Sequence, residues 1–119
     1  VLIVSGGLGL YLRPWAAAQG LEVLCSELEV VDGQCTGTFA GEQCVGAEKA
    51  RRVCERIDLA NHTKVHAYGD TPEDAAMLAI ADQRIDMLDG IGSTKLRGCG
   101  APCTVRRGVF TLVFGDFLL

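Results

Sequence analysis

The sequence of 119 residues lacks any uninterrupted apolar run of the roughly 18 residues that a membrane-spanning helix needs. The apolar stretch at 109–119 is broken by Gly115-Asp116. Basic charge is also scarce: 11 Lys and Arg against 15 Asp and Glu give a net charge of −4. The arginine pairs at 51–52 and 106–107 are too short to form a surface for phosphate backbones. These absences argue against a membrane protein and against nucleic acid as a partner.

A signal-peptide pattern and internal repeats are missing as well, and the six cysteines do not stand in a loop-rich chain. Cys54 falls on the apolar face of a predicted helix, where a buried free thiol is expected. We therefore expect a reduced, cytoplasmic protein. Cys99 and Cys103 form a pair that could serve a metal or redox role, but no second ligand pair accompanies them. His62 and His66 lie far upstream.

The overall amino-acid composition is that of one globular domain. Hydrophobic residues make up 49% of the chain and charged residues 22%, and the length suffices for a buried core. Patterning is clear up to about residue 82 and weakens afterwards. We therefore predict a partial core domain at residues 1–89 and a poorly specified tail at 90–119.

Alternating strand and helix signals dominate the patterned part. Residues 1–4 form an apolar, β-branched run, typical of a strand buried on both faces of a parallel sheet and ending at Ser5-Gly6-Gly7. A helix then runs to Gly20, with Pro14 expected to separate or kink its first turn. The other expected elements are hairpin strands at 28–31 and 35–39 around Asp32-Gly33, helices at 47–57 and 72–81, a buried strand at 65–68, and short strands at 84–88 and 109–114. This order predicts an α/β fold with a three-layer, Rossmann-like core, a mainly parallel sheet and an added β-hairpin.

The run from Tyr68 to Asp74 follows a short apolar strand and opens a helix. Asp70 and Asp74 therefore lie at the carboxyl end of a strand, where open α/β sheets bind their ligands. Two carboxylates on a tight turn suit Mg²⁺, which takes one or two carboxylates together with water and phosphate. The same residues also suit plain helix capping, with Thr71 as the N-cap and Pro72 in the first turn. The residues alone leave both interpretations open.

Two further polar features fit a phosphate site. Ser5 ends the first strand, so its hydroxyl and the backbone N–H of Gly6 could cradle a phosphate. Lys49 stands at the start of a helix, where a cation is unfavourable unless it neutralises an anion such as phosphate or the carboxylates. Taken singly, Ser5 could also cap a helix and Lys49 could be a solvated charge.

The order of these features resembles the haloacid dehalogenase superfamily of phosphohydrolases, and more narrowly its phosphoserine-phosphatase-like subfamily with a helical cap. The resemblance covers about residues 1–82. It rests on an apolar strand ending at Ser5, a hairpin with Asp32-Gly33 and Thr36-Gly37, Gly46-x-x-Lys49, and Tyr68-Gly69-Asp70-x-x-x-Asp74 with Met77-Leu78 behind it.

The resemblance implies a role for each matched residue. Ser5, with Gly6, would bind the substrate phosphoryl group, and Lys49 would stabilise the charge of a phosphoaspartate. Asp70 would ligate Mg²⁺ directly, and Asp74 would do so through water or would pair with Lys49. The implied function is Mg²⁺-dependent hydrolysis of a small-molecule phosphate monoester.

One family feature is absent from the sequence. No Asp-x-Asp follows an apolar strand, so the nucleophilic carboxylate and the general acid/base of the family are missing, as is the cap. In the family's sheet that first strand lies between the strands ending at Ser5 and Asp70. We expect either direct pairing of those two strands or a recruited strand. Residues 109–114 are the internal candidate, with Asp116 beyond their end, and a strand from another chain would give a strand-exchanged homo-oligomer.

Two functional classes follow. The first is the core fragment of a phosphomonoesterase, inactive by itself because no covalent intermediate can form without the aspartate. The second is a non-catalytic module that keeps a phosphate or Mg²⁺ pocket, or only the scaffold.

Overall fold

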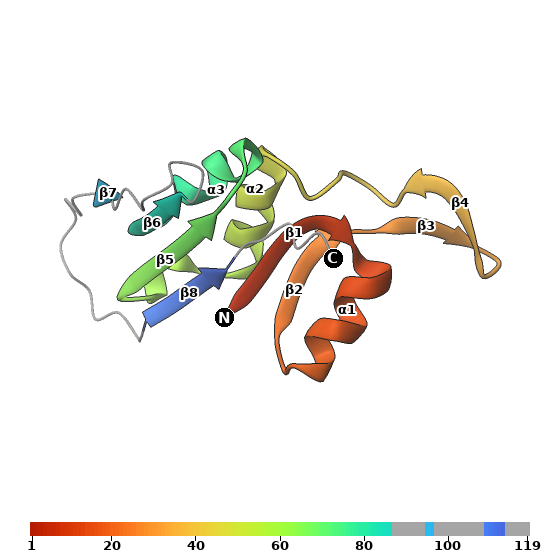
Figure 1. The fold of residues 1–119 in the computed structure, drawn as a ribbon, viewed down its shortest axis with the longest axis horizontal. Coiled ribbons are helices and arrows are strands. Elements are labelled where there is room, and N and C mark those ends of the chain that lie inside the picture. Colours follow the sequence, from red (N-terminus) through yellow and green to blue (C-terminus); the bar gives the residue numbers. More distant parts are fainter. Residues whose placement is uncertain (87–94, 97–108, 114–119) are drawn as a thin grey trace.

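The computed structural model describes residues 1–86, 95–96 and 109–113. Within them, six strands form one sheet in the order β2-β1-β8-β5-β6-β7 (Figure 1). The strands are β1 (Leu2–Leu8), β2 (Glu22–Ser26), β5 (Lys64–Gly69), β6 (Gln83–Asp86), β7 (Lys95–Leu96) and β8 (Val109–Val113). All neighbours run parallel except β6 and β7. The predicted α/β class with a mainly parallel sheet agrees with this topology.

Strand β8 occupies the centre of the sheet. It runs parallel to both neighbours, with Leu112 opposite Leu2 of β1 and opposite Ala67 of β5 (Figure 1). The internal candidate therefore fills the position that the sequence analysis left open, and β1 and β5 do not pair directly. Asp116 lies outside the described residues. Strands β7 and β8 lie beyond residue 89 and belong to the same sheet as the core strands. The domain boundary proposed at residue 89 stays a prediction.

Helices cover the two faces of the sheet unequally. Helices α2 (Ala47–Arg56) and α3 (Ala75–Leu78) pack on one face, and α1 (Gly9–Ala18) packs on the other face over β1 and β2 (Figure 1). The larger core lies on the α2–α3 side and contains Leu2, Val4, Cys44, Val53, Val65, Ala67, Met77, Leu78 and Ala81. The smaller core contains Ile3, Ala16, Val23 and Cys25.

Residues 65–68 were predicted as a buried strand, and burial along β5 alternates from residue to residue. Val65, Ala67 and Gly69 are buried toward α2 and α3, whereas the alternate residues Lys64, His66 and Tyr68 are only partly buried. The period of two follows from the alternation of side chains in a strand. A full three-layer core is therefore not established over this part of the sheet.

Several local predictions need correction. Strand β1 continues through Ser5, Gly6 and Gly7 to Leu8, so the serine lies inside the strand rather than at its end. Helix α1 is a single helix containing Pro14. Pro14 removes only the hydrogen bond to the carbonyl of Leu10, and both residues are on the exposed face, where water can satisfy that carbonyl.

Strand β2 was not predicted, although it pairs in parallel with β1 at the sheet edge. The expected helix at 72–81 is shorter than predicted. It begins as a 3-10 turn, Pro72–Asp74, and continues as α3, which ends at Leu78. A second 3-10 turn, Leu59–Asn61, follows α2 and is capped by Asp58.

The β-hairpin is confirmed. Strands β3 (Leu28–Val31) and β4 (Gln34–Phe39) form a separate antiparallel pair that extends away from the main sheet (Figure 1). Its turn residues Asp32 and Gly33 have φ values of 50° and 78°, which a tight two-residue hairpin turn requires.

The four cysteines in the described part of the chain are free. The placement of Cys54 was wrong, because it is exposed and the buried thiols are Cys25 and Cys44. The buried stripe of α2 runs through Lys49 and Val53, and Cys54 lies one residue further round the helix. Cys99 and Cys103 lie outside the described residues. In the described part of the chain, no helix has the length and apolar character needed to cross a membrane.

Candidate active site

The predicted site residues lie at one edge of the sheet. Ser5 is the middle residue of β1, beyond the part of that strand that pairs with β8, and Asp70 follows β5 directly. Because β1, β8 and β5 are parallel, the carboxyl ends of β1 and β5 emerge on the same side, on either side of the central strand. The sheet topology thus brings together two segments that are 65 positions apart in the sequence.

The loop after β5 is built around the carboxylate of Asp74. Its Oδ2 accepts hydrogen bonds from the backbone N–H groups of Asp70 and Thr71, each at 3.1 Å, and from the Thr71 hydroxyl at 3.0 Å. Gly69 permits this close packing, since a β-carbon there would lie 2.7 Å from Cβ of Asp74. Thr71 and Pro72 take the N-cap and first-turn positions expected from the sequence. Asp74 therefore fixes the backbone that carries Asp70.

The second oxygen of Asp74 is paired with Lys49. Lys49 Nζ lies 2.7 Å from Asp74 Oδ1, and the side chains are 2% and 1% exposed. Lys49 is in the first turn of α2, which starts after Gly46, whose φ of 54° suits glycine. Burial raises the pKa of the Asp74 carboxyl, but the Lys49 ammonium and the Thr71 donors outweigh it and hold that pKa below its ordinary value. The unfavourable position of a lysine at a helix start is thus offset by a buried ion pair.

Asp70 presents a different environment. Its Oδ1 is buried and has no hydrogen-bond partner among the described residues. A buried, unpaired carboxylate oxygen is costly unless a cation or donor completes it. The chemistry of this oxygen fits Mg²⁺, which binds one carboxylate and fills its other positions with water and phosphate oxygens. The described residues contain no cluster of three or more Asp, Glu, His or Cys side chains that could hold a metal ion.

Ser5 is 4% exposed, and its hydroxyl oxygen accepts the backbone N–H of Gly7 at 3.0 Å. Gly6 lies between them in β1. Burial raises the pKa of the Cys44 thiol, and the charge of Lys49 and the nearby Ser5 backbone lower it.

Cys44 was missed by the sequence analysis. It precedes α2 in a loop without periodicity, so no local pattern marks it as buried. Burial raises the pKa of its thiol, despite the opposing effects of Arg52 and Lys49. Its backbone N–H donates to the Ser26 hydroxyl at 2.9 Å, which anchors the loop to the end of β2.

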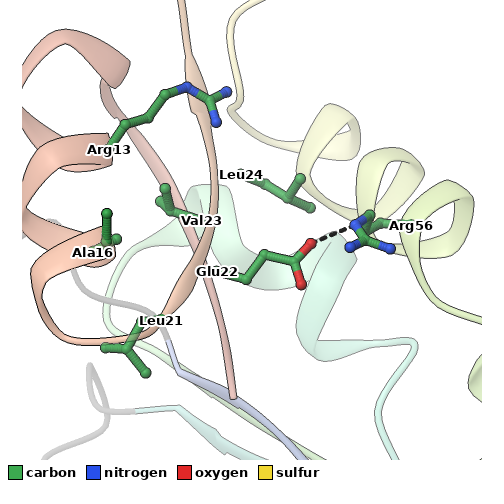
Figure 2. Close-up of a pocket in the computed structure, with 8 residues that line it drawn as sticks. Arg13, Ala16, Leu21, Glu22, Val23, Leu24 and Arg56 are labelled. Carbon is green, nitrogen blue, oxygen red and sulfur yellow. Dashed lines mark hydrogen bonds and ion pairs between the residues drawn. The ribbon is translucent and has the colours of Figure 1, made fainter.

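A separate hollow lies beside the edge strand β2 (Figure 2). It is lined by Arg13, Ala16, Ala17, Leu21, Glu22, Val23, Leu24 and Arg56. Arg56 is paired with Glu22 there, and Arg13 Nε donates to Glu27 at 2.6 Å. None of the predicted site residues lines this hollow, and its two arginines are already neutralised by glutamates.

The chain belongs to the haloacid dehalogenase-like hydrolase family, whose sequence profile matches residues 1–79. It is also similar to Protein CicA of Caulobacter vibrioides, with 33% identity over 90 residues in each of two strains, NA1000/CB15N and ATCC 19089/CB 15. Each alignment covers 71% of this chain and 38% of the relative, so the chain spans about two fifths of the length of these proteins. No solved structure matches the sequence significantly.

Proposed function

We propose that the complete protein is a Mg²⁺-dependent phosphomonoester hydrolase of the phosphoserine-phosphatase-like subfamily, acting through a phosphoaspartate intermediate. Its substrate would be a small-molecule phosphate monoester. In this proposal, the present chain contributes the residues that bind the phosphate and the metal. Family membership supports hydrolase chemistry in general, and the finer assignment rests on the site.

The buried, unpaired Oδ1 of Asp70 is the observation that carries the proposal. Asp74 has both oxygens occupied, whereas Asp70 keeps one oxygen free at the sheet edge where ligands bind. Asp70 would therefore hold the metal, and Asp74 would keep Lys49 and the loop in place. When bound, Mg²⁺ would neutralise charge on the phosphoryl oxygens.

The remaining residues would act on the substrate phosphate. Ser5 and Gly6 would bind its oxygens, and the Lys49 ammonium would offset the negative charge that builds up during transfer. By the family resemblance, the nucleophilic carboxylate would lie on the central strand of the sheet. Strand β8 has the sequence Val-Phe-Thr-Leu-Val and carries no carboxylate.

The lack of a carboxylate residue in the sequence of β8 favours the second candidate, a non-catalytic module that binds phosphate or Mg²⁺. The two candidates share the binding site and differ in turnover. We expect no turnover of p-nitrophenyl phosphate by the purified chain in the presence of Mg²⁺. Turnover that disappears in Asp70→Asn would refute this expectation and favour the enzyme.

Metal binding is tested by titrating Mg²⁺ into the full chain and following the backbone amide resonances of residues 69–74. We expect saturable shifts in the wild type and their loss in Asp70→Asn. Asp32→Asn is the matched control, since asparagine is accepted at the positive φ of the hairpin turn far from the site. Equal shifts in Asp70→Asn and the wild type would contradict the assignment of Asp70.

A further inference from the structure

A second hydroxyl group lies beside Ser5. Tyr11 is in the first turn of α1, and its hydroxyl oxygen lies close to the backbone of Gly7. A β-carbon built on Gly7 would lie 2.5 Å from the Tyr11 hydroxyl oxygen. The same β-carbon would lie 3.2 Å from the hydroxyl oxygen of Ser5. The hydroxyl groups of Tyr11 and Ser5 therefore both lie close to Gly7.

The geometry of β1 explains why they meet. Ser5 and Gly7 are two residues apart in one strand and face the same side of the sheet. That side is covered by α1, because Ile3, the next residue on it, belongs to the smaller core with Ala16. Since Gly7 has no side chain, the Tyr11 hydroxyl can lie close to its backbone, beside the hydroxyl of Ser5.

Both hydroxyl groups can donate a hydrogen bond to a ligand. The Ser5 oxygen accepts the N–H of Gly7, which leaves its own O–H to donate elsewhere. Among the described residues, no group forms a hydrogen bond with the Tyr11 hydroxyl, and Tyr11 is 55% exposed. The structure thus holds two neutral hydroxyl donors close together, one on the buried Ser5 and one on the exposed Tyr11.

We propose that Tyr11 is a substrate-binding residue that donates a hydrogen bond to the phosphoryl group held by Ser5. This inference rests on the proposed function, because it takes the occupant to be a phosphate monoester or inorganic phosphate. A tetrahedral phosphate presents several acceptor oxygens, so two hydroxyls on one side of it can each bind an oxygen. Tyr11 adds a donor without adding positive charge to a site that already has Lys49.

The test measures inorganic phosphate binding to the full chain with Mg²⁺ present, by calorimetry. Tyr11→Phe removes only the hydroxyl, and we expect it to weaken phosphate binding about tenfold, the loss of roughly one hydrogen bond to a charged group. Leu10→Ala is the control on the same helix turn, since Leu10 is 72% exposed, and it should bind phosphate as the wild type does. Thermal unfolding midpoints should be alike in all three proteins.

Gly7→Ala provides a second variant. Its methyl group would meet the Tyr11 hydroxyl at 2.5 Å and displace it, so phosphate binding should weaken. In the Tyr11→Phe background the same change should cost little more, because the hydroxyl is already gone. A purely structural role for Tyr11 would give additive losses in the double variant and would overturn the proposal.

The outcomes separate the inference from the function on which it rests. If the wild type binds phosphate, Ser5→Ala weakens binding and Tyr11→Phe does not, the role of Tyr11 is refuted and the proposed function stands. If the wild type binds no phosphate, the proposed function fails and the role of Tyr11 fails with it.

Discussion

Replacing either partner of the Lys49–Asp74 ion pair should destabilise the protein, but by different amounts. The two side chains are almost fully buried, and Lys49 Nζ has Asp74 Oδ1 as its partner at 2.7 Å. Asp74 has three further donors, all on Oδ2. Losing Asp74 therefore leaves the lysine without its counter-charge, whereas losing Lys49 leaves an aspartate that is still largely satisfied.

These contacts set the expected magnitudes. Asp74→Asn should cost about 3–5 kcal/mol of unfolding free energy, the range for breaking a buried ion pair by removing one partner. Lys49→Met keeps much of the side-chain volume and removes one charged hydrogen bond, so it should cost about 2 kcal/mol. The double variant buries no charge, and it should be more stable than the sum of the single losses predicts by about 2 kcal/mol.

Urea unfolding near pH 7, followed by circular dichroism, measures all four proteins of this cycle. Arg51→Met is the control, because the Arg51 side chain is exposed, its ion pairs with Glu48 and Glu55 lie on the surface of the same helix, and their loss should cost less than about 1 kcal/mol. Equal losses for Lys49→Met and Asp74→Asn, or additive losses in the double variant, would refute the argument that the Asp74 carboxylate organises the loop.

Three other predictions follow from the structure. Burial raises the Asp74 pKa, but Lys49 and the other donors lower it further, so its stabilisation is full above about pH 5 and is lost as pH falls below about 4. Acid titrations of unfolding should therefore be flatter in Asp74→Asn, and an identical acid limb would contradict this. Burial raises the pKa of the Cys25 thiol to about 11 and raises that of Cys44, so mass spectrometry after thiol labelling should find both unmodified in the folded chain and modified in urea. Thr111→Pro should abolish cooperative unfolding, because β8 pairs on both sides and proline removes a ladder hydrogen bond, and a native thermal transition would argue against a central β8.

Local patterns predicted the elements that carry the site. The apolar run before Ser5 and the one before Asp70 are both strands, and the amphipathic stretch that carries Lys49 is helix α2. The Asp-Gly turn also gave the hairpin at the predicted place. These features are encoded within a few residues, since strand, helix and turn signals depend on neighbouring side chains.

Features that depend on distant contacts were harder to predict. Strand β2 is a sheet edge between α1 and the hairpin, and its short apolar run gains strand character only by pairing with β1. The contact between Tyr11 and Gly7 arises because α1 folds back over its own preceding strand. Cys44 is buried by the packing of a loop with no periodic pattern. None of these leaves a signal in the local sequence.

In the proposed function, the central position of β8 separates ligand binding from catalysis. The residues that would bind phosphate and metal lie on β1, α2 and the loop after β5, whereas β8 pairs with β1 and β5 through the sheet. A strand that pairs well with β1 and β5 can therefore complete the sheet and keep this edge in place whether or not it carries a nucleophile. Asp70 would then keep its affinity for a cation, and Ser5 its affinity for phosphate, in a protein that does not turn over substrate. Ligand binding without turnover is the behaviour that this arrangement predicts for the chain.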